Sequence, residues 1–214
     1  EDYAEITSLC EAGVESNPDK LEFYFYLAIA YNHYNREADA KTICQQALLH
    51  VNEQSPKEMV SDFYAIIGDA SHAQGADEEA YQAYEKALQY HPDNISVLNN
   101  YAYYLSLERR DLDRAEEMSY RTVKAEPQNA TYLDTYAWIL FEKGNYAEAR
   151  IYIDQVIKVA KEEEMSPEVL EHCGDIHALT DDLPGALEYW KRALEKGSES
   201  KLLKRKLNER RYLK

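Results

Sequence analysis

Glycine and proline are scarce in this chain of 214 residues, which holds only 7 Gly and 6 Pro. A protein of many strands joined by tight turns needs more of both, whereas the abundant Ala, Leu, Glu and Lys favour helices. No apolar run approaches the length of about 18 residues that crosses a membrane. The sequence therefore predicts an all-α protein with no membrane-spanning segment.

Cysteines and catalytic motifs are also few. Cys10, Cys44 and Cys173 show no CxxC spacing, so we expect three small buried hydrophobes rather than a zinc site or a disulfide set. No phosphate-binding loop, HExxH, GxSxG or GxGxxG motif occurs. In EHCGDIH, His172 and Asp175 are three residues apart, but a core or surface role is favoured over a metal site. The sequence predicts no enzyme, no cofactor and no metal.

Positive charge is in short supply over most of the chain. The formal net charge is −16, which argues against a nucleic-acid partner because phosphate binding needs a cationic face. Residues 200–214 are the exception, with seven Lys or Arg against one Glu. The chain begins at Glu1 without an initiator Met and inside a structural unit, with no visible signal peptide. We expect it to be a fragment or a processed form.

A repeat of 34 residues runs through the sequence, with residues 61–94 as its template. Position 8 of each copy is always small, and position 20 is always Ala. Large residues at positions 4, 7 and 11 form one helical stripe. Gly75 and Gly144 lie where two helices of a copy join, a place that suits a positive φ. The pattern therefore predicts that each copy forms a helix–turn–helix unit, in which the small residues let the two helices approach closely.

These positions resemble the tetratricopeptide repeat (TPR), in its small-residue, Ala and Pro positions alike. The resemblance implies a right-handed α-solenoid of helix–turn–helix repeats with a capping helix at its C-terminal end. Short insertions at 55–60 and 164–166 should lengthen two junctions. We expect one TPR array over 1–200, with 1–18 as the second helix of a truncated repeat and 201–214 as a basic capping helix. The full repeats are 21–54, 61–94, 95–129 (with one inserted residue between its helices), 130–163 and 167–200.

The resemblance also implies a binding surface, because positions 2, 5, 9 and 12 of the first helices face the groove in that family. The twenty residues at these positions include seven acids and no Lys or Arg. The candidate partner-binding residues are Phe25, Ile29, Asp69, His72, Asn99, Tyr103, Asp134, Trp138, Phe141, Glu171 and Asp175.

This groove composition favours one kind of partner. Without a lysine it cannot form the clamp by which TPR chaperone adaptors hold an acidic C-terminal tail. An acidic, aromatic groove should bind a protein or peptide that is basic or neutral and carries apolar anchors. Trp138 and Phe141 fall outside the repeat's core pattern and are the leading anchors, with packing between neighbouring repeats as the alternative for Trp138.

The sequence leaves two main functions open. The first is a non-catalytic interaction scaffold or adaptor. The alternative is a structural, self-assembling spacer, in which the basic cap docks on an acidic face of another copy and forms a homo-oligomer. An enzyme would have only a carboxylate pair such as Asp69 with Asp134. Residues 97–197 also resemble the C-terminal repeats of bacterial envelope TPR proteins, many of them lipoproteins. This likeness implies a periplasmic or envelope location, with the cytoplasm as the alternative.

Overall fold

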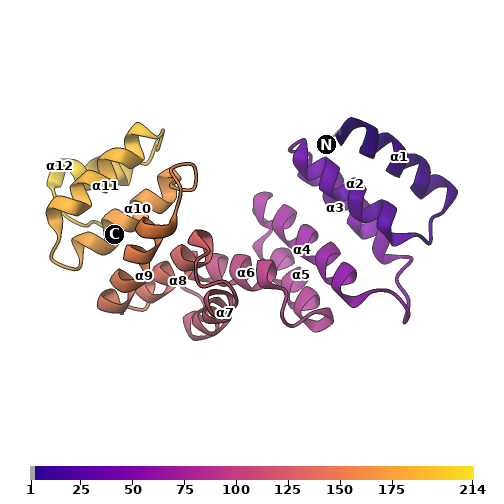
Figure 1. The fold of residues 1–214 in the computed structure, drawn as a ribbon, viewed down its shortest axis with the longest axis horizontal. Helices are drawn as coiled ribbons and strands as arrows, with labels where there is room; N and C mark the ends of the chain where they lie inside the picture. The colour runs from indigo at the N-terminus through magenta and orange to yellow at the C-terminus, as the bar shows by residue number, and fades with distance from the viewer. Residues whose placement is uncertain (1–2) are drawn as a thin grey trace. The chain divides into compact units, whose positions relative to one another are not determined.

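The computed structural model describes residues 3–214, and all of the regular elements in that range are α-helices (Figure 1). None of these helices is long and apolar enough to cross a membrane. The predicted helix over 1–18 corresponds to α1, although residues 1–2 lie outside the described range. The elements are α1 Tyr3–Ser16, α2 Leu21–His33, α3 Glu37–Leu48, α4 Lys57–Ala73, α5 Asp77–Tyr90, α6 Ile95–Leu107, α7 Leu112–Ala125, α8 Ala130–Glu142, α9 Tyr146–Val159, α10 Pro167–Ala178, α11 Leu183–Glu195 and α12 Lys201–Glu209.

The chain divides into two compact units, Glu1–Asn100 and Tyr101–Lys214, and the division falls within α6. Each unit has its own apolar core. Tyr24, Leu27 and Phe63 are buried in the first unit, and Leu133 and Trp190 are buried in the second. The expectation of one array over residues 1–200 stays a prediction.

Within each unit, consecutive helices pack as the repeat predicts, with α4 on α5 in the first and α8 on α9 and α10 on α11 in the second. The Ala at position 20 is fully buried in every copy, as are the Ala residues at position 8. Small side chains at both positions allow the two helices to approach closely, which confirms the all-α TPR fold. Position 20 is occupied by Ala40, Ala80, Ala115, Ala149 and Ala186.

Two of the copies have glycine rather than alanine at position 8, and there an aromatic ring fills the space. A Cβ on Gly68 would lie 2.5 Å from the ring of Tyr84, and one on Gly174 would lie 2.2 Å from the ring of Trp190. Where position 8 is Ala137, its counterpart at position 24 is the smaller Ile153, which is also fully buried. The volumes at positions 8 and 24 therefore compensate each other.

The turns between paired helices rely on left-handed residues. Gly75 and Gly144 have φ of 73° and 84°, as the sequence predicts. The inserted residue of the third copy lies in the turn between α6 and α7, where Arg109 and Asp111 both take positive φ. One extra residue is thus absorbed by a second left-handed position in the turn.

The junction before α4 spans residues 49–56 and is longer than the one before α6, which spans 91–94, as the insertion predicts. Residues 57–60 themselves form an extra turn at the start of α4. One expected boundary is wrong, because the basic capping helix does not extend over 201–214. It ends at Glu209, since Arg210 takes the left-handed conformation with φ of 50° and turns the chain back. Residues 210–214 are called the C-terminal tail below.

Candidate functional site

A hollow of about 280 Å³ lies in the second unit, among α6, α8, α10, α12 and the C-terminal tail. Trp138 forms part of its wall, together with Tyr103 from α6 and His172 from α10. We call it the Trp138 hollow. Its lining residues are Tyr103, Leu107, Trp138, Glu142, Glu168, Glu171, His172, Asp175, Leu202, Lys206, Tyr212, Leu213 and Lys214.

Aromatic rings stack along one side of this hollow. Trp138 lies between Phe141 and His172, with ring centroids 4.9 Å and 4.1 Å away and interplanar angles of 18° and 16°. Trp138 and Phe141 share a face of α8 because they are three residues apart. The Trp138 indole remains half-buried, and its Nε1 has no hydrogen-bond partner among the described residues. Trp138 therefore packs against the neighbouring repeat and also forms part of the wall of the hollow.

A buried ion pair between Asp134 and His172 holds the His172 ring in this stack. Nδ1 of His172 lies 3.0 Å from Oδ2 of Asp134, and both side chains are almost fully buried. Burial by itself would lower the pKa of His172, but the charge and hydrogen bond of Asp134, with Glu168 and Asp175, raise it above the ordinary value. A protonated imidazole stacked on an indole gains cation–π attraction. Asp134 thus orients His172 and favours its protonated form.

Tyr103 links α6 to α10 at the edge of the hollow. Its hydroxyl donates to Oε1 of Glu168 at 2.6 Å, and its ring lies 6.1 Å from that of His172. Burial, followed by the interaction with Glu168, raises the pKa of Tyr103, so the phenol stays neutral. Glu168 is exposed and makes no ion pair with any described residue. Its negative charge is therefore available to a ligand.

Lys206 enters the site from the capping helix and is buried there, unlike most basic residues of that helix. Lys206 is 2% exposed, and its Nζ lies 2.6 Å and 2.8 Å from the two carboxylate oxygens of Asp175. It also donates to Glu171 at 2.9 Å. The reason is helical spacing, because Lys206 shares the face of α12 on which Leu203 is fully buried.

The Trp138 hollow therefore contains a lysine from outside the repeat positions counted in the sequence, but this lysine is already paired. Asp175 also accepts from Nε1 of Trp190 at 2.9 Å. Burial raises the pKa of Asp175 to about 6, while Lys206 and Trp190 act in the opposite direction. Two of the predicted groove acids, Asp134 and Asp175, are thus held by internal partners, and the groove is less acidic than its composition indicates.

The C-terminal tail lies against the hollow. Tyr212 meets Phe141 edge-on, with ring centroids 5.6 Å apart, and its ring lies 5.4 Å from Nζ of Lys206. Leu213 and Lys214 also line the hollow. Phe141 is only 4% exposed. Burial raises the pKa of Tyr212 to about 12, so its hydroxyl is neutral at ordinary pH.

The remaining predicted residues lie in the first unit and do not line the Trp138 hollow. Phe25 packs edge-on against the buried Phe63, while Ile29 is 37% exposed. His72 is half-buried, with Nδ1 2.8 Å from Asp77. Asn99 is 5% exposed, and its Oδ1 lacks a hydrogen-bond partner among the described residues.

Asp69 has the same kind of internal partner as Asp175. It accepts from the hydroxyl of Tyr84 at 2.6 Å and from Nδ2 of Asn100 at 3.1 Å. In both copies that have Gly at position 8, the aromatic at position 24 crosses the glycine and donates to the acid at position 9. The signal was present in the sequence as Gly-Asp followed by Tyr84 or Trp190.

The structure therefore brings together six predicted residues in the second unit: Tyr103, Asp134, Trp138, Phe141, Glu171 and Asp175. The sequence pattern did not reveal His172, Lys206 or Tyr212 as residues of the site. Lys206 was detectable, because it lies three residues after Leu203 on the same helix face. Nothing in the sequence places Tyr212, since the tail has no repeat pattern. The described residues hold no cluster of metal-ligating side chains.

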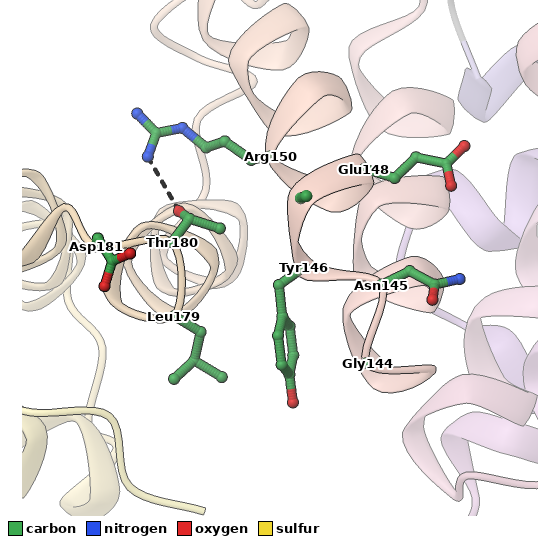
Figure 2. A pocket seen from close by; sticks show the side chains of 9 residues that line it. Gly144, Asn145, Tyr146, Glu148, Arg150, Leu179, Thr180 and Asp181 are labelled. Carbon is green, nitrogen blue, oxygen red and sulfur yellow. Dashed lines mark hydrogen bonds between the residues drawn. The ribbon is translucent and has the colours of Figure 1, made fainter.

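A second, wider hollow of about 830 Å³ opens between the turn that precedes α9 and the turn that follows α10 (Figure 2). Figure 2 shows the guanidinium of Arg150 pointing at Thr180, 3.1 Å from its hydroxyl. Arg150 also pairs with Asp154 at 2.9 Å and Asp182 at 3.2 Å. These contacts fasten two neighbouring repeats, and no predicted site residue lines this hollow.

Comparison with known families agrees with the packing of the helices. The model of the cytochrome c-type biogenesis protein H TPR domain matches residues 61–166, and a tetratricopeptide repeat model matches residues 137–201. The chain belongs to the tetratricopeptide-repeat family. A relative within this TPR family is the TPR repeat-containing protein PA4667 of Pseudomonas aeruginosa, which is 27% identical over 134 residues. That match covers 62% of this chain and only 22% of the relative.

Solved structures of other TPR proteins share the fold. PilF of Pseudomonas aeruginosa superposes with a TM-score of 0.67 at 19% identity, covering 88% of this chain and 83% of PilF. PilW, a type IV pilus biogenesis factor, gives 0.69 at 16% identity, covering 89% and 85%. YrrB, described as a TPR protein with an unusual peptide-binding site, gives 0.64 at 17% identity, covering 96% and 97%. At these identities the likeness establishes the fold alone.

Proposed function

We propose that this TPR chain is a non-catalytic interaction scaffold that binds a peptide or partner protein in the Trp138 hollow. The observation that carries the proposal is the half-buried Trp138, stacked between Phe141 and His172 at the wall of a hollow. A rigid aromatic surface of this kind offers apolar contact area at little entropic cost.

The charges around the hollow favour a basic or neutral segment with apolar anchors. Glu168 makes no ion pair with the described residues, whereas Glu142 is paired with Arg109 and Glu171 with Lys206. The net charge of −16 attracts cationic partners over a longer range. Asp134 and Asp175 contribute mainly through His172 and Lys206 in this proposal, rather than by touching the ligand.

The relatives support an interaction role. Several solved TPR structures belong to assembly factors or binding proteins by their descriptions, among them PilW and YrrB. The cytochrome c biogenesis model and the pilus proteins also support a bacterial envelope location for this chain. Fractionation of the source bacterium tests the location, and recovery in the cytoplasm alone would contradict it.

A random peptide library displayed on phage and panned against the immobilised chain tests the proposed function. We expect enriched peptides that bind the purified chain in fluorescence anisotropy, and Trp138→Ala should weaken that binding at least tenfold. Tyr120→Ala is the matched control, because Tyr120 is 50% exposed in the same unit and outside the hollow. Circular dichroism confirms that helical content is unchanged. Enrichment that is insensitive to Trp138→Ala, or no enrichment, would refute the proposal.

A further inference from the structure

The C-terminal tail occupies part of the site in which we have proposed that a partner binds. Its Tyr212 covers Phe141 edge-on at 5.6 Å, and Leu213 and Lys214 line the same hollow. The acids Glu142, Glu168 and Glu171 line this hollow as well. The tail therefore places an aromatic ring against Phe141 and contributes Lys214 to the lining that also contains these acids.

The tail is held weakly. Residues 212–214 make no hydrogen bond with the described part of the chain, and the backbone contact nearest to them is the Arg211 N–H donating to Lys206 at 3.2 Å. Tyr212 also lines three separate hollows. These are the Trp138 hollow and two others of about 440 Å³ and 140 Å³. A side chain with open space on several sides has lost dispersion contacts that a well-packed residue keeps. A competing segment would therefore displace the tail at small cost.

We infer that the tail mimics the ligand and occupies its place in the hollow. The partner segment carries an aromatic residue followed closely by leucine and lysine, as Tyr212–Lys214 does. This inference rests on the proposed function and adds the chemistry of the partner and the step of displacement. The partner's aromatic ring takes the place of Tyr212 against Phe141, and its cation meets Glu168. An occupied site lowers the apparent affinity by the fraction of molecules in which the tail is in place.

A synthetic peptide with the sequence Arg-Arg-Tyr-Leu-Lys, labelled for fluorescence anisotropy, tests the inference with the full chain. The double variant Tyr212→Ser, Leu213→Ser should bind this peptide at least tenfold more tightly than the unmodified chain does. Tyr120→Ser is the matched control and should leave peptide binding unchanged. Adding Glu168→Gln to the double variant should weaken binding several-fold, because Gln still accepts from Tyr103 but has no charge.

The result that overturns the inference is equal peptide binding by the double variant and the unmodified chain, with helical content preserved. A concentration-dependent dimer that Tyr212→Ser abolishes would overturn it too, since the tail would then belong in the hollow of another copy. If the double variant is misfolded, the single change Leu213→Ser gives the same comparison with a smaller expected gain. Library peptides that still bind through Trp138 would show that this inference alone has failed, and not the proposed function.

Discussion

At the scale of single residues, the site depends on charges that the protein neutralises internally. Lys206 and Asp175 form an ion pair that is almost fully buried, and Trp190 donates to the same carboxylate. Pairs of this kind add little net stability, but the loss of one partner leaves an uncompensated buried charge. The cap is therefore tied to α10 by a contact that tolerates no change on one side alone.

Replacing Lys206 by methionine should lower the free energy of unfolding by about 3–5 kcal/mol, because Asp175 would lose its cation. Urea denaturation followed by circular dichroism measures the change. Lys204→Met on the exposed face of α12 is the matched control and should change stability by less than about 0.5 kcal/mol. Adding Asp175→Asn to Lys206→Met should recover much of the loss, and a lack of recovery would contradict the pairing.

His172 gives the second unit a pH dependence of defined sign. Its pKa is raised in the folded state, since the attraction of Asp134 outweighs the effect of burial. The stabilisation that this raised pKa provides is complete below about pH 6.5, the ordinary pKa of a histidine in the unfolded chain. It is lost as the pH rises through the higher pKa that His172 has in the folded protein. Stability should therefore decline above about pH 6.5 through this group.

Asp134→Asn should abolish or reverse that decline, because burial alone lowers the pKa of His172. Urea denaturation of both proteins at a series of pH values gives the comparison. Taking the difference between them cancels other titrating groups, such as His177, whose pKa is lowered by burial. Parallel pH profiles for the two proteins would show that the ion pair does not set the dependence.

At the scale of helices, paired volumes at positions 8 and 24 decide how closely two helices pack. Gly174→Ala should cost about 1–3 kcal/mol, because the new methyl group would lie 2.2 Å from the Trp190 ring. Thermal unfolding measures the loss. The double variant Gly174→Ala, Trp190→Ile copies the pairing of Ala137 with Ile153 and should recover part of it. A Gly174→Ala protein as stable as the unmodified one would contradict the packing account.

The helices themselves could be predicted from the sequence, since the small residues at positions 8 and 20 recur at a fixed period. The positive φ of Gly75 and Gly144 in the turns likewise followed from local geometry, whereas the left-handed Arg109 and Asp111 were not predicted. The candidate site was predicted only in part. Periodicity places Trp138 and Phe141 on one helix face, but it cannot show that Asp134 and Asp175 meet His172 and Lys206. Those contacts join residues from different helices, and the tail has no period at all.

At the scale of the whole molecule, the repeats pack around two separate apolar cores, and the chain has a net charge of −16. The basic residues within 200–214 differ in their exposure to solvent. Lys206 is buried, whereas Lys204, Arg210 and Arg211 are exposed. The terminal helix therefore buries one charge against the last repeat, while the other cations of the helix and the tail are exposed to solvent.

The stack on Trp138 makes the protein its own optical probe. The chain has two tryptophans, and Trp190 is fully enclosed while Trp138 lies between Phe141 and His172. A charged imidazole in contact with an indole quenches its fluorescence by accepting an electron from the excited state. Emission from Trp138 would consequently brighten whenever His172 loses its proton or is pushed aside. Intrinsic fluorescence thus reports events in the hollow without any attached dye.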